Sequence, residues 1–133
     1  MRNISASLTK EQIRKSVELV RAGKAPVKDV TRRLGWLNLK AGDRLQVCEK
    51  CQGLKPGESL VRICVIEVVS VRRERLDRMI TDVAYGFKEC KREGFGEDAR
   101  LMWPTEFVEF FCATHKGCTP ETVITRIEFK YIL

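Results

Sequence analysis

Six cysteines and one histidine are the residues of this chain with the strongest potential for metal chemistry. Cys48 and Cys51 form a Cys-x2-Cys pair, and Cys112, His115 and Cys118 form a second, looser group. Four thiolate or imidazole ligands around one ion make a structural zinc site. The second group is more widely spaced than a usual zinc knuckle, so zinc is the lesser alternative to reduced, free thiols.

A second set of residues has the types needed to bind nucleic acid. Lys24, Lys28, Arg32 and Arg33 lie close together in sequence, and Trp36 follows them. Cationic side chains hold phosphates, which positions a nucleic acid without reading its sequence. A tryptophan can stack on an unpaired base. The alternative interpretation is a solvated charged surface, with Trp36 packed under the adjacent turn.

The composition is that of a globular protein. The chain has 133 residues, of which 44% are apolar and 32% charged, and this predicts a single domain over residues 1–133. The net charge is +7, and residues 1–33 hold nine lysines or arginines against three acidic residues. A localised basic region favours polyanionic partners. Neither a membrane-spanning run nor a signal peptide is evident, so we expect a cytoplasmic protein without membrane contact.

Hydrophobic periodicity predicts an α+β fold with about five or six strands and about three helices. Strands or extended segments are expected at residues 3–8, 27–33, 44–49, 60–71 and 122–133. Helices are expected at residues 10–21 and 77–92 and from residue 104 onward. Thr9 is expected to cap the first helix. In the last strand, the alternation places Arg126, Glu128 and Lys130 on the solvent side.

Several segments resemble an ASCH domain, in particular the short stand-alone versions of phages and bacteria. They are Val30–Trp36, Leu39–Leu45, Glu93–Phe95, Glu106–Val108 and Thr125–Phe129. The resemblance implies a PUA-like fold, a small mixed β-barrel that is partly open and has a cleft beside its first helix. In the wider superfamily such clefts bind RNA or modified bases.

The resemblance also implies a candidate catalytic set. Some bacterial family members hydrolyse the acetyl amide of N4-acetylcytidine with a threonine, a lysine and a glutamate. Lys28 and Thr31 have the spacing of that lysine and threonine, and Glu93 has the place of the glutamate. The threonine would be the nucleophile, the lysine its base, and the glutamate a proton carrier or orienting group. On an extended strand Lys28 and Thr31 would face opposite sides, so catalysis requires a twisted or bulged backbone between them.

Three functional hypotheses therefore stand, in this order. The first is a protein that binds RNA or a modified nucleoside in a basic cleft. The second is a small amidohydrolase that acts on N4-acetylcytidine-like nucleosides. The third is an accessory protein whose basic face binds an acidic protein partner. We expect no cofactor, and a monomer is favoured.

Overall fold

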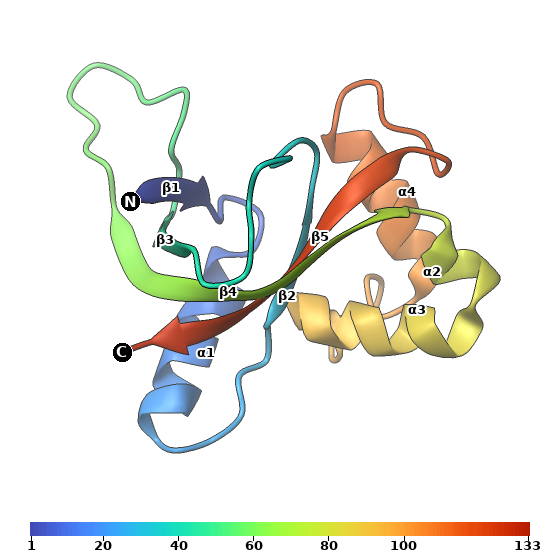
Figure 1. The fold of residues 1–133 in the computed structure, drawn as a ribbon, viewed down its shortest axis with the longest axis horizontal. Coiled ribbons are helices and arrows are strands. Elements are labelled where there is room, and N and C mark those ends of the chain that lie inside the picture. The colour runs from blue at the N-terminus through green and yellow to red at the C-terminus, as the bar shows by residue number, and fades with distance from the viewer.

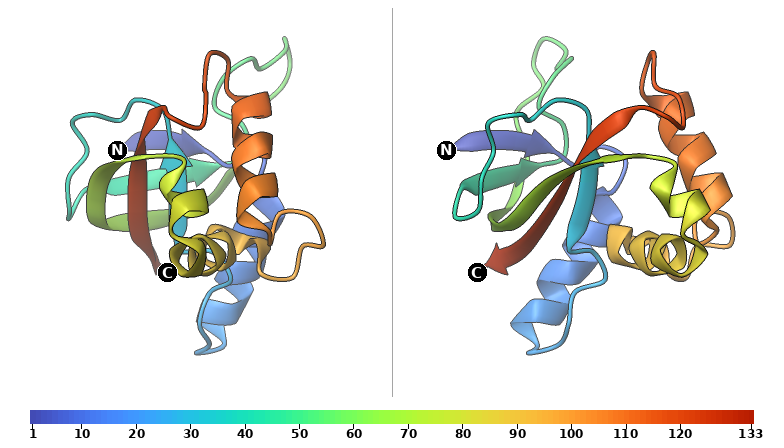
Figure 2. Two further views of the ribbon diagram at one scale, coloured as in Figure 1. Left: turned by 90° about the vertical axis from the view of Figure 1, so that its right-hand side faces the viewer. Right: turned by 45° about the vertical axis from the view of Figure 1, so that its right-hand side comes forward.

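One five-stranded sheet forms the centre of the computed structural model, which describes all residues 1–133 (Figure 1). Its strands are β1 (Arg2–Ser5), β2 (Val30–Arg33), β3 (Arg44–Cys48), β4 (Arg62–Arg75) and β5 (Val123–Ile132). The strand order is β1-β3-β4-β5-β2. β1 runs parallel to β3 and all other pairs are antiparallel. The sheet curls into a half-barrel (Figure 2), and this confirms the predicted α+β fold with a mixed, partly open barrel.

The helices gather in two places around this sheet. They are α1 (Lys10–Arg21), α2 (Arg78–Thr81), α3 (Val83–Cys90), the π-helical turn η1 (Lys91–Phe95) and α4 (Pro104–Thr114). α1 covers one part of the sheet, whereas α2, α3 and α4 pack together at the other end of the long strands (Figure 1). None of these helices combines the length and the apolar character that crossing a membrane would demand.

The segment predicted as one helix over residues 77–92 is divided into α2 and α3. Asp82 has an extended backbone, with φ −110° and ψ 91°, and this ends α2. Its side chain accepts a hydrogen bond of 3.2 Å from the backbone N–H of Tyr85, which caps α3. The C-terminal end of this helical region agrees with the prediction. Gly94 adopts a φ of 102°, which disrupts the helical turn after Glu93.

Two further predictions about side chains are wrong. Thr9 precedes α1 but makes no capping hydrogen bond with its side chain. Arg126 is only 3% exposed, although the alternation places it on the solvent side. β4 and β2 pair with the two edges of β5, Glu89 of α3 covers Arg126 on one face, and Ile127 packs into the core on the other face. Burial of this kind depends on tertiary packing and cannot be predicted from the alternation of apolar and polar residues along the strand.

The apolar core consists of two clusters. One lies between the sheet and α1 and includes Ile127 of β5. The other lies among α2, α3 and α4 and includes Ile124 of the same strand. Arg126 lies between these two residues on β5 and begins a group of buried charged side chains. The candidate site is built from that group and from β2, the neighbour of β5.

Candidate functional site

The backbone around Lys28 is held from both sides before β2 begins. The Ser16 hydroxyl of α1 accepts a 3.1 Å hydrogen bond from the Lys28 N–H, and Tyr131 of β5 donates its hydroxyl to the Lys28 carbonyl at 2.7 Å. Val27 lies in a bend, and the strand starts only at Val30. The strict alternation of a strand therefore does not extend back to Lys28, whose side chain lines the same cavity as that of Thr31.

Lys28 and Glu93 form a buried ion pair. The Lys28 Nζ lies 3.0 Å from Glu93 Oε1, and it also donates to the carbonyl oxygens of Glu93 at 3.0 Å and Val30 at 2.7 Å. Both side chains are at most 5% exposed. Burial lowers the pKa of the Lys28 ammonium, while the Glu93 carboxylate opposes this effect and the guanidinium groups of Arg33 and Arg32 add to it. A lysine with a lowered pKa can release its proton more readily and act as a base.

A second ion pair of opposite polarity holds the same two segments together. Arg92, next to Glu93, donates to both carboxylate oxygens of Asp29, next to Lys28, at 3.0 Å each. The Asp29 N–H also donates to the Arg92 carbonyl at 3.0 Å. These contacts hold the segment of Lys28 and Asp29 against the segment of Arg92 and Glu93. They therefore keep the Lys28 and Glu93 side chains close together.

Behind this pair lies a network of buried guanidinium and carboxylate groups. Arg32 donates to Glu93 Oε2 at 3.0 Å and to Glu89 Oε1 at 2.6 Å. Arg126 binds both oxygens of Glu89, with Nη2 at 3.1 Å from Oε2. The side chains of Arg32, Arg126 and Glu89 are at most 4% exposed. The network thus connects β2 and β5 to α3 and orients the carboxylate of Glu93.

The network predicts a loss of stability in acid. Burial raises the pKa of the Glu89 carboxyl, but the bonds and charges of Arg126 and Arg32 outweigh it and hold this pKa at about 2. A carboxyl whose pKa is lower in the folded than in the unfolded chain stabilises the fold above its unfolded pKa. That contribution, about 3 kcal/mol for a difference of this size, is lost as the pH falls from about 4.5 toward 2. Urea unfolding of wild type and Glu89→Gln at several pH values measures it. We expect the free energy of unfolding of wild type to fall by this amount in acid. Glu89→Gln should be less stable at neutral pH and should not show this fall.

Thr31 and Arg33 lie on the face of β2 opposite to that of Arg32. The Nε of Arg33 donates a 3.1 Å hydrogen bond to the Thr31 hydroxyl oxygen. Thr31 is 5% exposed, and its hydroxyl makes no direct hydrogen bond with the Lys28 Nζ. The predicted catalytic set is therefore assembled around one cavity, with Lys28 and Glu93 bonded to each other and Thr31 bonded to Arg33.

The cavity has a volume of about 230 Å³ and lies between β2 and α4, beside the start of α1. We call it the β2–α4 cavity. Its ionic residues are Lys28, Arg32, Arg33 and Glu93. Its hydroxyl residues are Ser5, Ser7, Thr9, Thr31 and Thr114.

Aromatic side chains form the wall opposite β2. They are Phe95, Phe107, Phe110, Phe111 and His115. The rings of Phe111 and His115 are stacked, with centroids 3.9 Å apart and an angle of 8° between their planes. His115 is further fixed by a 2.8 Å contact between its Nδ1 and the Phe111 carbonyl oxygen. Flat apolar surfaces facing hydroxyl and ionic groups suit a ligand that is aromatic and rich in hydrogen-bonding atoms.

Two of the residues predicted to bind nucleic acid, Lys24 and Trp36, are not part of this cavity. Lys24 is exposed beyond the far end of α1. Trp36 is half-buried against the sheet cluster, and the guanidinium of Arg2 lies 4.1 Å from its ring centroid. Lys28 and Arg32 line the cavity, but both are buried and paired with carboxylates. Protein carboxylates thus already engage these two side chains, and their role as phosphate contacts stays a prediction.

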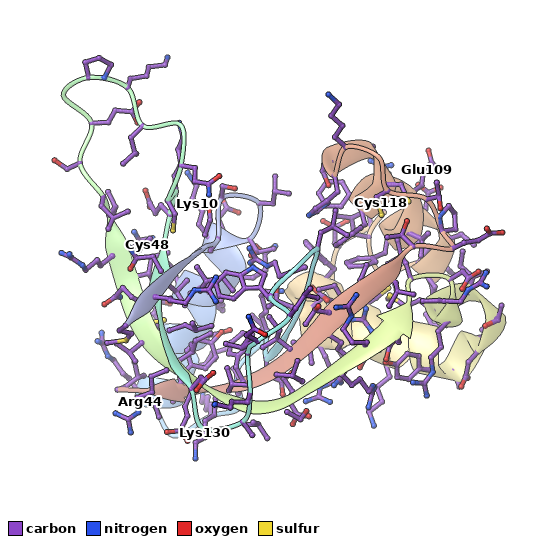
Figure 3. The ribbon with its side chains drawn as sticks, turned by 45° about the horizontal axis from the view of Figure 1, so that its top comes forward. Lys10, Arg44, Cys48, Glu109, Cys118 and Lys130 are labelled. Carbon is purple, nitrogen blue, oxygen red and sulfur yellow. The ribbon has the colours of Figure 1, made fainter.

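The structure does not assemble the candidate zinc ligands. Cys48 lies at the end of β3, whereas Cys118 lies beside α4, on the opposite side of the molecule (Figure 3). Cys112 and Cys118 have sulfur atoms 4.0 Å apart, but no three His, Cys, Asp or Glu side chains are close enough to hold a metal ion. His115 faces the β2–α4 cavity as an aromatic wall residue.

Sequence reasoning missed Glu89, Arg126 and the wall formed by α4. Glu89 has no motif around it, and Arg126 has the spacing of a solvent-facing strand residue. The adjacent Phe110 and Phe111, followed by His115 about one turn later, are the signal that could have indicated an aromatic wall.

Comparison with known proteins gives matches in structure only. No protein-family model matches the sequence, and no curated protein matches it. An ASCH domain from Lactobacillus crispatus JV V101 has a similar structure, with a TM-score of 0.53 and 15% sequence identity over 98% of this chain and 77% of that one. A protein of Enterococcus faecalis V583, described by the family model DUF984, matches with a TM-score of 0.52 and 15% identity over 99% of this chain and 80% of that one.

Proposed function

We propose that this chain, which has the fold of an ASCH domain, binds a modified nucleoside in the β2–α4 cavity. The observation that carries this proposal is the pairing of an aromatic wall with a polar wall across about 230 Å³. This volume is somewhat below the range typical of drug-sized ligands, roughly 300–1,000 Å³, and suits a base with part of its sugar. Stacking on an aromatic side chain is worth about 1–3 kcal/mol per base.

A nucleoside fits this site better than a continuous RNA strand does. An RNA backbone needs exposed cations along its path, and each one that contacts a phosphate releases counterions. Two of the predicted phosphate-binding residues, Lys28 and Arg32, are buried and paired with carboxylates. The ligand in this proposal is therefore recognised by its base and not by its phosphates.

Binding can be measured by isothermal titration with N4-acetylcytidine. We expect saturable binding that changes little with salt. Phe110→Ala should raise the Kd by roughly 5- to 100-fold, because it removes a ring from the cavity wall. Phe87→Ala is the matched control, since Phe87 is 39% exposed on α3 and lies outside the cavity. Absence of saturable binding, or an equal effect of the two substitutions, would contradict the proposal.

A second candidate function is hydrolysis of an acyl amide on the bound nucleoside. It is favoured by Lys28, Thr31 and Glu93 all lining the same cavity. In this reaction the Thr31 hydroxyl attacks the acyl carbon, and its proton passes to the Lys28 amine. The C–N bond then breaks, and the proton is returned to the leaving amino group. Water hydrolyses the resulting threonine ester, which releases a carboxylate and restores the hydroxyl.

The lowered pKa of Lys28 gives this candidate a defined pH dependence. Burial, the largest cause, lowers the pKa of the Lys28 ammonium below its ordinary value of 10.5, so the lysine loses its proton at a lower pH. The value of kcat/KM should therefore rise with pH and level off below pH 10.5. Lys28→Arg keeps the positive charge but cannot release a proton, so it should abolish the reaction.

A further inference from the structure

Arg33 differs from the buried cations of the site because no carboxylate forms an ion pair with it. Its Nε donates to the Thr31 hydroxyl, and its two terminal nitrogens make no hydrogen bond or ion pair within the chain. The residue is partly buried and lines the β2–α4 cavity. Burial lowers the pKa of its guanidinium, and the charge of the Glu93 carboxylate, which makes no bond with Arg33, only partly opposes this effect. Its terminal N–H groups are donors available to a ligand.

The other three cations of this region all have carboxylate partners. Lys28 and Arg32 pair with Glu93, Arg32 and Arg126 pair with Glu89, and Arg126 also lies 3.9 Å from Glu128. The next carboxylate, Glu74, lies 3.5 Å from Arg32 but is shared with two surface arginines. Partial burial of an unpaired charge is unfavourable, and an anionic ligand that pairs with Arg33 would relieve this cost.

We infer that Arg33 is an anion anchor, and that the end of the ligand beside Thr31 carries a carboxylate or develops an oxyanion. This inference rests on the proposed use of the β2–α4 cavity and specifies the ligand class for it. A planar guanidinium with two free terminal nitrogens matches the two oxygens of a carboxylate. Its bond to Thr31 places those oxygens next to the hydroxyl that would attack an acyl carbon. The carboxylate released by such a reaction would occupy the same position.

Acetate is a direct probe of the anchor, because it can be titrated without any nucleoside. The experiment records two-dimensional NMR spectra while acetate replaces chloride at constant ionic strength. We expect saturable shifts for the Thr31 methyl group and the Arg33 Nε–H. Arg33→Gln should weaken acetate binding by roughly 10- to 100-fold, because it removes a charge-assisted hydrogen-bonding partner. Arg33→Lys, which keeps the charge without the planar fork, should give an intermediate loss.

Lys24→Gln is the control for a non-specific effect of charge, since Lys24 is exposed beyond the far end of α1. If no saturable shift occurs, or if Lys24→Gln weakens acetate binding as much as Arg33→Gln, the anchor is refuted. Titration of the same variants with N4-acetylcytidine separates the two claims. Nucleoside binding without acetate binding refutes the anchor and leaves the proposed function standing. Acetate binding through Arg33 without nucleoside binding supports the anchor and refutes the proposed function.

Discussion

Replacing Glu89 with alanine is expected to lower the free energy of unfolding by about 3–5 kcal/mol. The reason is that Glu89 binds two buried guanidinium groups, those of Arg32 and Arg126, and is itself 1% exposed. Removing one member of a buried ionic network leaves its partners charged and desolvated. For a domain with a typical stability of about 5–15 kcal/mol this is a large fraction of the total. Urea unfolding followed by circular dichroism measures the change.

Glu106→Ala is the matched control for this measurement. Glu106 pairs with Arg100 at 2.9 Å, but both side chains are well exposed, so its loss should leave the urea midpoint unchanged. The double substitution Glu89→Leu with Arg126→Met should be less damaging than Glu89→Leu alone, because it also removes one of the stranded charges. Equal effects of Glu89→Ala and Glu106→Ala would show that the network contributes nothing to stability.

Thr31→Val is expected to abolish amide hydrolysis while preserving ligand binding, if the second candidate function holds. Valine has the shape of threonine but no hydroxyl, so kcat should fall by at least about 10³-fold. The Kd for N4-acetylcytidine should change by less than about tenfold, the value of one neutral hydrogen bond. Chromatographic detection of cytidine gives the rate, and isothermal titration gives the Kd.

Thr105→Val provides the control for this substitution, because Thr105 is exposed on α4 and does not line the cavity. Its activity should equal that of wild type. Retention of activity in Thr31→Val would remove the nucleophile from the mechanism. Loss of binding and activity together would assign Thr31 to ligand recognition instead.

The sequence predicted the sheet well because its signals are local. β3 and β5 have clear strand patterns between turn residues, and the central strand β4 is apolar on both faces around its middle. The spacing of Lys28, Thr31 and Glu93 could be recognised only through the resemblance to a family. The structure brings these three side chains to one cavity because the strand begins after Lys28, a detail that no residue pattern marks.

The parts that sequence reasoning missed depend on contacts between distant segments. Glu89 and Arg126 are 37 positions apart, and each resembles an ordinary surface residue of its own element. Their burial follows from α3 packing against a strand that is already covered on both edges. The aromatic wall arises in the same way, because α4 turns toward β2 residues that precede it by more than 70 positions.

A crystal structure of Thr31→Val soaked with N4-acetylcytidine tests the central claim most directly. We predict that the base lies in the β2–α4 cavity against the Phe110 side, with its acyl oxygen toward Arg33. A nucleoside bound at another surface, or an empty cavity at ligand concentrations that saturate binding in solution, would contradict it.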